Sequence, residues 1–339
     1  MTRADAATSS SAAGLGPHGE RAAGPELAAL TQSVREEARS HAFEVALLLH
    51  TRASDWSRRQ IAGIEATLAE AGAKISDIID CEFSPSAQVA AIDRLIAARP
   101  DAVIAIPVGG TVVTDAFRRL ATSGVRLILL DNVPSGLLPE SDYASAVSCD
   151  NFRLGQIAAE LLSPHVPPGG RVCVAAYSVD FFATAQREIG FDKWMRCERP
   201  DIRLAHLKFE TPARAVEVIT TYLKKEPEPD GVFIVWDEPA VAALPVLSTC
   251  KRPPAMTTVD LGAAAAAALG EGRILCGVAA QNPFRQGAVA AAAAILVLTG
   301  RSVPSWIVVP ALTATPRNAS AVYREVSGAE TLFTSSPVA

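Results

Sequence analysis

The sequence predicts an α/β protein of two lobes, each built on a doubly wound parallel sheet. From Phe43 onward, short apolar runs alternate with stretches of helical periodicity. The runs are apolar throughout rather than at every second position, which is typical of strands buried on both faces of a parallel sheet. The pattern restarts after about residue 150, and 339 residues are enough for two lobes of ordinary size.

The first half of the chain supplies the strands and helices of the first lobe. The expected strands are FEVALLLH (43–50), KISDIIDC (74–81), AVIAIPV (102–108) and RLILLDN (126–132). Between them, helices are expected around residues 57–72, 86–98 and 112–123. Each strand is therefore followed by a helix, as parallel pairing requires.

The second half repeats this alternation and then departs from it. After a helix at 152–162, the expected strands are RVCVAAY (171–177), RLAHLKF (203–209), GVFIVWD (231–237) and MTTVDL (256–261). The helices between them are expected at 183–196, 212–225 and 238–249. We expect three later segments to be extra elements that return to the first lobe: ILCGVAAQ (274–281), an alanine-rich helix at about 285–299, and WIVVPAL (306–312).

Composition excludes several classes of protein. Hydrophobic residues make up 49%, charged residues 20%, and the mean hydropathy is +0.23, which suits a soluble protein with a large core. The net charge of -5 gives no basic surface for nucleic acid. The longest apolar run, from Gly262, is too short and too rich in alanine to span a bilayer. Six scattered cysteines favour buried free thiols over a disulfide framework and leave the cellular compartment open.

Residues 1–42 are rich in Ala, Ser, Gly and Thr and predict a disordered or weakly helical leader. They lack the apolar stretch of about 7–15 residues that marks a secretory signal. The segment GLGPHG (14–19) matches G-x-G-x-x-G, but no strand precedes it and no helix follows it. It is therefore not interpreted as a dinucleotide site.

The first candidate site residues lie after the first strand. Ser57 and Gln60 form an S-x-x-Q capping box, which would start the helix at Ser57. Asp55 and Trp56 would then lie just outside the helix, at the carboxyl end of the strand. Ligands of open parallel sheets bind outside these strand ends. The location therefore predicts that both residues contact a ligand.

Aromatic and hydrogen-bonding side chains recur near the other strand ends, and the candidates are Asp131, Asn132, Phe181, Phe182, Arg187, Trp236, Asp260 and Gln281. Aromatic faces cover C–H surfaces, whereas carboxylates and a guanidinium bond to hydroxyl groups, so the mixture suits a neutral polyhydroxylated ligand. Structural alternatives remain open. Asp237 is the best candidate for a helix cap. Trp56 alone is more typical of packing, and one of Phe181 and Phe182 is expected to be core.

The chain resembles the ribose-binding-protein type of periplasmic sugar-binding protein, the soluble receptor of bacterial ABC importers. The likeness runs from about Phe43 to about Pro316. It is carried by DWSRRQIAGIEATLAEAG, LLDNVP, VSCDN, ATAQREIGF, FIVWDEPA, TTVDLG and AAQNPFRQG. It implies the type 1 periplasmic-binding-protein fold with a three-segment hinge, near residues 149–150, 281–282 and 311–312. The implied division is a leader (1–42), an N-terminal lobe (43–149 plus 282–311), a C-terminal lobe (150–281 plus 312–327) and a tail (328–339).

The resemblance also implies roles for the candidate residues. Asp55 and Trp56 fall in the aromatic-bearing first loop, and Asp131 matches an aspartate after the fourth strand. Arg187 matches the second-lobe arginine, while Asp260 and Gln281 match the last two polar contacts. Two positions depart from ribose binders: Asn132 replaces an arginine, and Trp236 replaces an asparagine. These departures point away from ribose and toward a linear polyol, such as a tetritol or pentitol, or another small sugar.

The function expected from this resemblance is capture of a small neutral polyol or sugar between two closing lobes and delivery to the transmembrane subunits of an ABC permease. A monomer in the periplasm is expected, although no signal peptide is visible and a cytoplasmic location is left open. The alternative is a sugar or polyol sensor of the same fold without a DNA-binding domain. No enzyme motif is present, His50 is the sole candidate base and is expected to be structural, and no cofactor or metal site is predicted.

Overall fold

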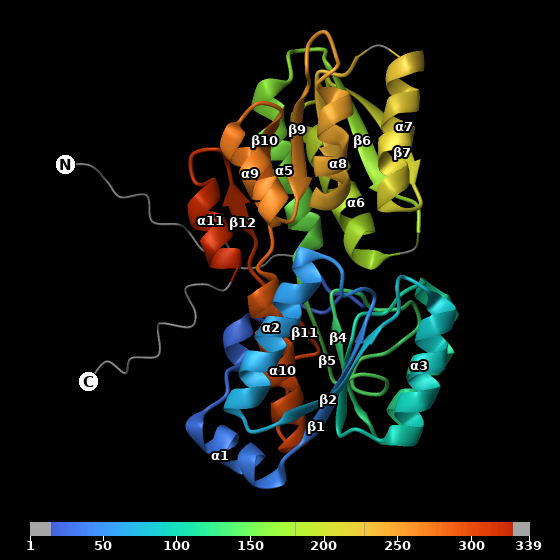
Figure 1. Ribbon diagram of the computed structural model, residues 1–339, viewed down its shortest axis with the longest axis vertical. Coiled ribbons are helices and arrows are strands. Elements are labelled where there is room, and N and C mark those ends of the chain that lie inside the picture. The colour runs from blue at the N-terminus through green and yellow to red at the C-terminus, as the bar shows by residue number, and fades with distance from the viewer. Residues whose placement is uncertain (1–14, 180, 227, 328–339) are drawn as a thin grey trace, which may run out of the picture.

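The computed structural model describes residues 15–179, 181–226 and 228–327. In this part of the chain, two six-stranded sheets form two lobes stacked end to end, each with helices on both faces of its sheet (Figure 1). The predicted two-lobed α/β class is confirmed. The remaining parts of the predicted leader (1–14) and tail (328–339) lie outside the described residues.

The first sheet has the strand order β11-β5-β4-β3-β1-β2, and all its pairs are parallel. Its strands are β1 (Glu44–Leu49), β2 (Lys74–Asp80), β3 (Ala102–Ala105), β4 (Arg126–Leu130), β5 (Ser145–Cys149) and β11 (Trp306–Val309). The strand order reverses direction between β1 and β3, so the loops after the strands diverge there and open at one edge of the sheet. This edge faces the second lobe.

The second sheet has the order β12-β10-β9-β8-β6-β7, and only β12 runs antiparallel to its neighbour among the described strands. Its strands are β6 (Arg171–Tyr177), β7 (Arg203–Phe209), β8 (Gly231–Ile234), β9 (Ala255–Val259), β10 (Leu275–Ala280) and β12 (Leu312–Ala314). The segment 274–281, expected to return to the first lobe, therefore belongs to the second, because β10 continues the sheet beside β9. WIVVPAL likewise divides between β11 in one sheet and β12 in the other.

Helices cover both sheets. Those of the first lobe are η1 (Pro25–Ala28), α1 (Gln32–His41), α2 (Asp55–Glu70), α3 (Pro85–Ala98), η2 (Gly110–Val113), α4 (Thr114–Thr122) and α10 (Pro283–Leu298). Those of the second lobe are α5 (Asn151–Leu162), η3 (Ser163–His165), α6 (Phe182–Glu198), α7 (Pro212–Lys225), α8 (Asp237–Leu247), α9 (Ala263–Glu271) and α11 (Ala319–Val326). The chain thus passes between the lobes three times, after β5, after β10 and after β11.

Helices α2 and α10 pack closely because each carries a glycine at their contact. A Cβ on Gly63 would lie 2.0 Å from the carbonyl oxygen of Phe284. A Cβ on Gly287 would likewise lie 2.0 Å from the carbonyl oxygen of Gln60. Only glycine permits this approach. It fixes α2, which begins beside the cleft, against the helix that returns from the second lobe.

The segment 15–42 is not the disordered or weakly helical leader that its composition predicts. Helix α1 begins after Thr31, whose Oγ1 accepts a hydrogen bond from the Val34 amide at 3.3 Å. Val34 and Ala38, one turn apart, are buried in the first-lobe core. Ala23 forms a parallel bridge to Ile307 of β11. The few apolar residues in this segment are spaced to cover the lobe, and small residues permit close packing there.

The start of α2 also differs from the sequence prediction. Ser54, not Ser57, is the N-cap, and its Oγ accepts from the Ser57 amide at 3.1 Å. Gln60 does not reach back to cap the helix, because its Nε2 donates to Oε1 of Gln286 at 3.1 Å. Asp55 and Trp56 therefore lie in the first helical turn. A carboxylate is favoured there by the helix dipole.

Candidate ligand-binding cleft

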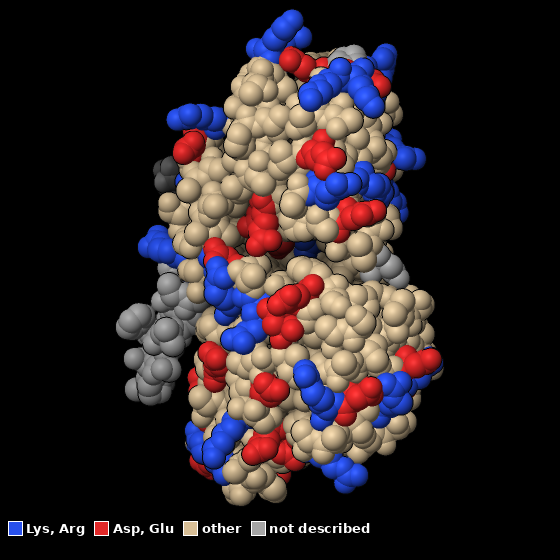
Figure 2. Space-filling model, turned by 45° about the vertical axis from the view of Figure 1, so that its right-hand side comes forward, with Lys and Arg blue, Asp and Glu red and all other residues tan. Residues whose placement is uncertain are grey.

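A cavity of about 490 Å³ lies between the two lobes. The β1–α2 connection and the first turns of α2 form its first-lobe wall, and the starts of α6, α8 and α9 contribute to its second-lobe wall. Figure 2 shows acidic and basic side chains meeting at the narrow waist between the lobes. The cavity volume is within the range of about 300–1,000 Å³ that is usual for small-molecule sites.

Seven of the ten predicted site residues line this cavity: Asp55, Trp56, Asp131, Phe181, Arg187, Trp236 and Asp260. The remaining three, Asn132, Phe182 and Gln281, do not. Both lobes contribute to the group of seven. The strand ends that are far apart in the sequence are thus brought to one place by the fold.

Asp131 and Asp260 occupy equivalent positions in the two lobes. Asp131 follows β4 and Asp260 follows β9, and both have a left-handed backbone, with φ of 57° and 71°. Non-glycine residues seldom adopt this conformation, and it concentrates at functional sites. Burial raises the pKa of the Asp131 carboxyl, while the nearby Arg187 guanidinium opposes that effect. The strained turns direct two buried carboxylates toward one arginine.

Arg187 is the centre of the buried polar contacts. Its Nε donates to Oδ1 of Asn151 at 2.9 Å, and its Nη1 donates to the Val235 carbonyl at 3.0 Å. Nη1 also pairs with Oδ2 of Asp260 at 3.2 Å. The side chain is 4% exposed, so these contacts fix its guanidinium in one orientation. A guanidinium held in this way presents its remaining N–H groups to a ligand at little entropic cost.

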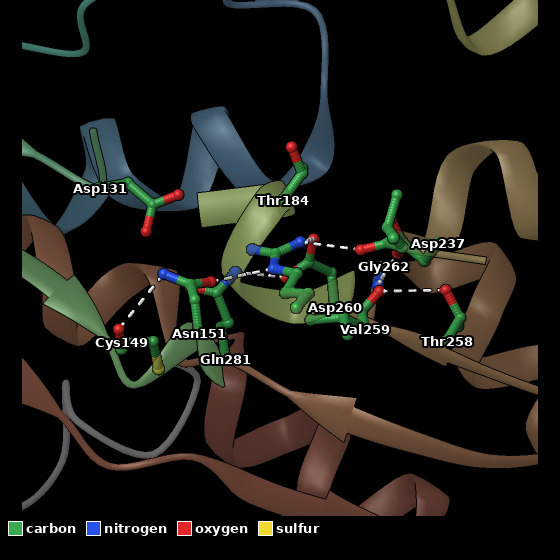
Figure 3. A network of polar contacts seen from close by, with 12 residues as sticks. Asp131, Cys149, Asn151, Thr184, Asp237, Thr258, Val259, Asp260, Gly262 and Gln281 are labelled. Carbon is green, nitrogen blue, oxygen red and sulfur yellow. Dashed lines mark hydrogen bonds and ion pairs between the residues drawn. The ribbon is translucent and has the colours of Figure 1, made fainter. Parts of the chain in front are cut away.

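Gln281 acts behind the cavity wall rather than on it. Its Nε2 donates to Oδ1 of Asp260 at 2.6 Å, and its Oε1 accepts from Nε2 of Gln286 at 2.7 Å. Both functional groups of the amide are therefore used inside the protein. Figure 3 shows Gln281 and Asp260 together within the network of polar contacts. Gln281 positions Asp260 and is too far into the hinge to line the cleft.

These contacts belong to a continuous series of side-chain hydrogen bonds, which we call the polar chain. In order, it contains Gln60, Gln286, Gln281, Asp260, Arg187, Asn151, Ser148 and Asp131. The series begins in the first lobe, enters the second at Gln281, and returns to the first between Asn151 and Ser148. It therefore connects both lobes through two of the three crossings.

Asn132 and Phe182 form a direct link between the lobes outside the cavity. Asn132 Nδ2 donates to the Pro107 carbonyl at 2.9 Å, and its Oδ1 accepts from the Phe182 amide at 3.1 Å. The Phe182 ring packs edge-on against Trp306 in the first lobe. Of the two adjacent phenylalanines, Phe181 thus lines the cavity and Phe182 is packed away from it.

Aromatic side chains form the apolar walls of the cleft. The His50 ring contacts Trp56, Phe83 and Phe181, with ring centroids 5.7, 4.9 and 6.3 Å apart. Burial lowers the pKa of His50 to about 4, so its imidazole is neutral at physiological pH. His50, which the sequence predicts to be structural, also lies on the cavity wall.

The opposite wall carries Trp236, which packs edge-on against Tyr177 at 5.2 Å and tilted against Phe209 at 5.1 Å. Tyr177 also lines the cavity, and the sequence did not identify it because it lies within the predicted strand 171–177 rather than after its end. The tryptophan stands at the N-cap position of α8. Its position just after a strand is the signal that identified it.

Two acidic residues at the start of α8 also line the cavity, Asp237 and Glu238. Asp237 is not the helix cap that the sequence predicts, because Trp236 holds the N-cap position and Asp237 is the first residue of α8. Its Oδ2 instead accepts a hydrogen bond from the Gly262 amide at 2.6 Å, which holds the β9–α9 loop. Burial, together with the Asp260 carboxylate, raises the pKa of Asp237 to about 7. Glu238 had no strand-end signal, because it lies one residue inside the helix.

The lobes touch directly across the cleft. Arg59 of α2 donates to the Leu261 carbonyl at 3.1 Å, and its guanidinium lies 4.8 Å above the Tyr323 ring. Asp55 in the same helix accepts from the Ala263 amide of the second lobe. These contacts describe a closed arrangement, in which a ligand would be enclosed by both lobes.

The described residues contain no group of three or more His, Cys, Asp or Glu side chains arranged to hold a metal ion. Within the same residues, no helix combines the length and the apolar character needed to cross a membrane. All six cysteines are free thiols, and Cys81, Cys149, Cys173 and Cys250 are buried. The expectation of free rather than paired cysteines is confirmed.

Two lobes joined by three crossings, with a cavity between them, are typical of a binding protein that closes around a ligand. A family model described as a periplasmic binding protein domain matches residues 45–302. The chain belongs to this family, which consists of binding proteins rather than enzymes. The family resemblance noted in the sequence is confirmed. A search of curated proteins found no match.

Solved structures share this fold. An ABC transporter solute-binding protein from Mycobacterium smegmatis with bound glycerol is 22% identical, with a TM-score of 0.75, covering 83% of this chain and 96% of that one. One from Agrobacterium vitis bound with alpha-D-tagatopyranose is 23% identical, with a TM-score of 0.75, covering 84% and 98%. Another from Agrobacterium vitis with bound allitol is 21% identical, with a TM-score of 0.72, covering 83% and 98%.

Proposed function

We propose that this protein is the solute-binding receptor of an ABC importer and that it captures a small sugar or sugar alcohol between its lobes. The single observation that carries this proposal is the composition of the closed cavity. Aromatic walls at Trp56, Phe181 and Trp236 face carboxylates and a fixed guanidinium at Arg187. Such walls cover the C–H faces of a polyhydroxylated chain, and the polar groups bond to its hydroxyls.

Similar proteins with the same fold support this ligand class. Their bound molecules are glycerol, tagatopyranose and allitol, which are small, neutral and rich in hydroxyl groups. Within the class, the departures at Asn132 and Trp236 favour a linear tetritol or pentitol over ribose. We further propose that the receptor acts as a monomer in the periplasm and delivers its ligand to the transmembrane subunits of a permease.

Ligand binding is tested by a thermal-shift screen of tetritols, pentitols, hexitols and pentoses. A ligand at 100 times its Kd should stabilise the protein by about 2.7 kcal/mol. For a lobe of this size, each kcal/mol corresponds to roughly 2–4 °C in Tm. A complete panel without any shift would refute the proposed ligand class.

A pair of tryptophan variants locates the site. Trp56→Ala removes one aromatic wall and should abolish the shift caused by the best ligand of the screen. Trp194→Ala is the matched control, because Trp194 packs against the second-lobe core and does not line the cavity. An unchanged shift in Trp56→Ala would remove this residue from the site.

A further inference from the structure

The cleft carries more carboxylates than cationic groups. Five carboxylate side chains line it, from Asp55, Asp131, Asp237, Glu238 and Asp260, whereas its guanidinium groups come from Arg58 and Arg187. Both guanidinium groups are already paired. Arg58 pairs with Asp55, and Arg187 pairs with Asp260. When all five carboxyl groups are ionised, a neutral ligand would therefore enter a cavity with an excess of negative charge.

The other three carboxylates have no ion-pair partner within the described residues. They are Asp131, Asp237 and Glu238. Asp131 accepts a hydrogen bond from the Ser148 hydroxyl at 2.7 Å, and Asp237 accepts one from the Gly262 amide at 2.6 Å. These are neutral donors, which satisfy an oxygen atom without balancing its charge.

The carboxylates of the two lobes meet near Gly262. A Cβ placed on this glycine would lie 2.8 Å from Oδ2 of Asp237 and 3.5 Å from Oδ2 of Asp55. Burial raises the pKa of Glu238, and the charges of Asp260 and Asp55 add to this effect. Closure of the lobes thus brings like charges together. A positive charge on the ligand would relieve this repulsion.

Two residues of the cavity wall, His50 and Trp56, carry buried ring nitrogens without a hydrogen-bond partner in the described part of the chain. His50 is 7% exposed, and its imidazole makes no hydrogen bond within the described residues. The indole N–H of Trp56 is also buried without a partner there. A neutral imidazole accepts a hydrogen bond from an ammonium group, and the faces of Trp56 and Phe181 attract cations.

The positive charge that fits this site belongs to an organic ligand. The described carboxylates do not gather into a group that could hold a metal ion. The cavity is also lined by extended aromatic surface at Trp56, Phe181 and Trp236, which a bare ion would not contact. A carbon chain with hydroxyl groups and one ammonium group uses both kinds of surface.

We propose that the ligand is an amino sugar or amino polyol, bound with its protonated amine toward Asp237 and Glu238 and its carbon chain along the aromatic walls. This inference rests on the proposed function, because it specifies the ligand of the same cleft. The pKa of a simple alkyl amine is about 10, and the electron-withdrawing oxygens of a sugar lower it, so the ligand carries its full charge at neutral and lower pH rather than above it.

Isothermal titration at pH 7 tests the inference with matched ligands. Each neutral sugar or sugar alcohol is compared with its amino-deoxy counterpart and with the N-acetylated amine, which has the added group without the charge. We expect the free amine to bind about tenfold more tightly than either neutral form, a difference of about 1.4 kcal/mol. Equal or tighter binding of a neutral form overturns the inference and leaves the proposed function intact. Absence of binding by every member overturns both.

Charge-neutral variants identify the carboxylates. Glu238→Gln should reduce the affinity for the amine about tenfold more than it reduces the affinity for the neutral parent. Asp115→Asn, at an exposed carboxylate of α4, is the control and should change neither. A trimethylammonium derivative adds a second readout, because its charge does not change with pH. The affinity of the wild type for this derivative should rise as Asp237 ionises near pH 7. If that affinity does not change with pH, and Glu238→Gln binds the amine as tightly as the wild type does, the assignment is overturned.

Discussion

Asp55 of the first lobe accepts a hydrogen bond from the backbone amide of Ala263 in the second, at 3.1 Å between Oδ2 and N. The contact joins the first turn of α2 to the first turn of α9 across the mouth of the cleft. The same hydrogen bond, with help from Arg58, lowers the pKa of the Asp55 carboxyl. Closure of the lobes is therefore linked to a carboxylate at the cleft itself.

Replacing Asp55 should weaken closure. In Asp55→Ala the Ala263 amide loses its charged acceptor, a contact worth about 1.5–3 kcal/mol. We expect ligand release to accelerate at least about tenfold with little change in the association rate. Stopped-flow tryptophan fluorescence measures both rates. Asp115→Ala removes an exposed carboxylate of the same lobe and should leave release unchanged. Equal release rates in the two variants would show that Asp55 does not hold the lobes together.

The contact between α2 and α10 should be sensitive to a single methyl group. Gly63→Ala places a Cβ 2.0 Å from the Phe284 carbonyl oxygen, so the helices must separate. Overpacking of this kind costs about 1–3 kcal/mol, and we expect a loss of that size in the free energy of unfolding. Gly270→Ala is the matched control, because a Cβ there meets no atom within 4 Å. It should be neutral or stabilising by up to about 1 kcal/mol in urea denaturation.

Gln281 should affect ligand affinity without touching the ligand. Gln281→Leu leaves Oδ1 of Asp260 and Nε2 of Gln286 without their partner, which costs about 1–3 kcal/mol of stability. It also frees Asp260 to move, so affinity should fall as well. Gln88→Leu is the comparison, because Gln88 is equally buried and bonded, to Ile106 and Val108 in the first lobe. Stability should fall in both variants, whereas ligand affinity should fall only in Gln281→Leu. If Gln88→Leu loses as much affinity as Gln281→Leu, Gln281 does not act by positioning Asp260.

Asp237 should make stability depend on pH. Its pKa rises from 3.8 to about 7 on folding, so between these values the folded protein binds more protons than the unfolded chain. The contribution of this group to stability is therefore present at low pH and is lost as pH rises through about 7. Asp237→Asn keeps an oxygen acceptor for the Gly262 amide but cannot ionise. The Tm of the variant minus that of the wild type should therefore increase from pH 5 to pH 8. A difference in Tm that stays constant over this range would contradict the assignment.

Much of the fold could be predicted because its strands are buried on both faces. Runs such as those at β3 and β8 are apolar throughout, so the pattern indicates parallel strands without any knowledge of their partners. The segment 15–42 escaped prediction because few of its residues are apolar. Its structure depends on contacts such as that of Ala23 with Ile307, which local sequence does not reveal.

The candidate site could be predicted as a set of strand ends but not in detail. Sequence position places Asp131, Asn132 and Gln281 near the cleft, yet the direction of each side chain depends on its backbone and its neighbours. Asp131 turns inward from a left-handed backbone, whereas Asn132 is held by Pro107 and Phe182. Glu238 was missed because it lies inside a helix rather than at a strand end.

The polar chain constrains how this protein can change over evolutionary time. Each of its three glutamine amides donates toward Asp260, so all three share one orientation. A replacement that exchanged donor and acceptor at one of these positions would place two donors or two acceptors against each other at the neighbouring residue of the polar chain. We therefore expect a substitution at Gln60, Gln281 or Gln286 to be accompanied by compensating substitutions at the other two positions, in both lobes. Families of sequences related to this chain should carry these positions as a linked set.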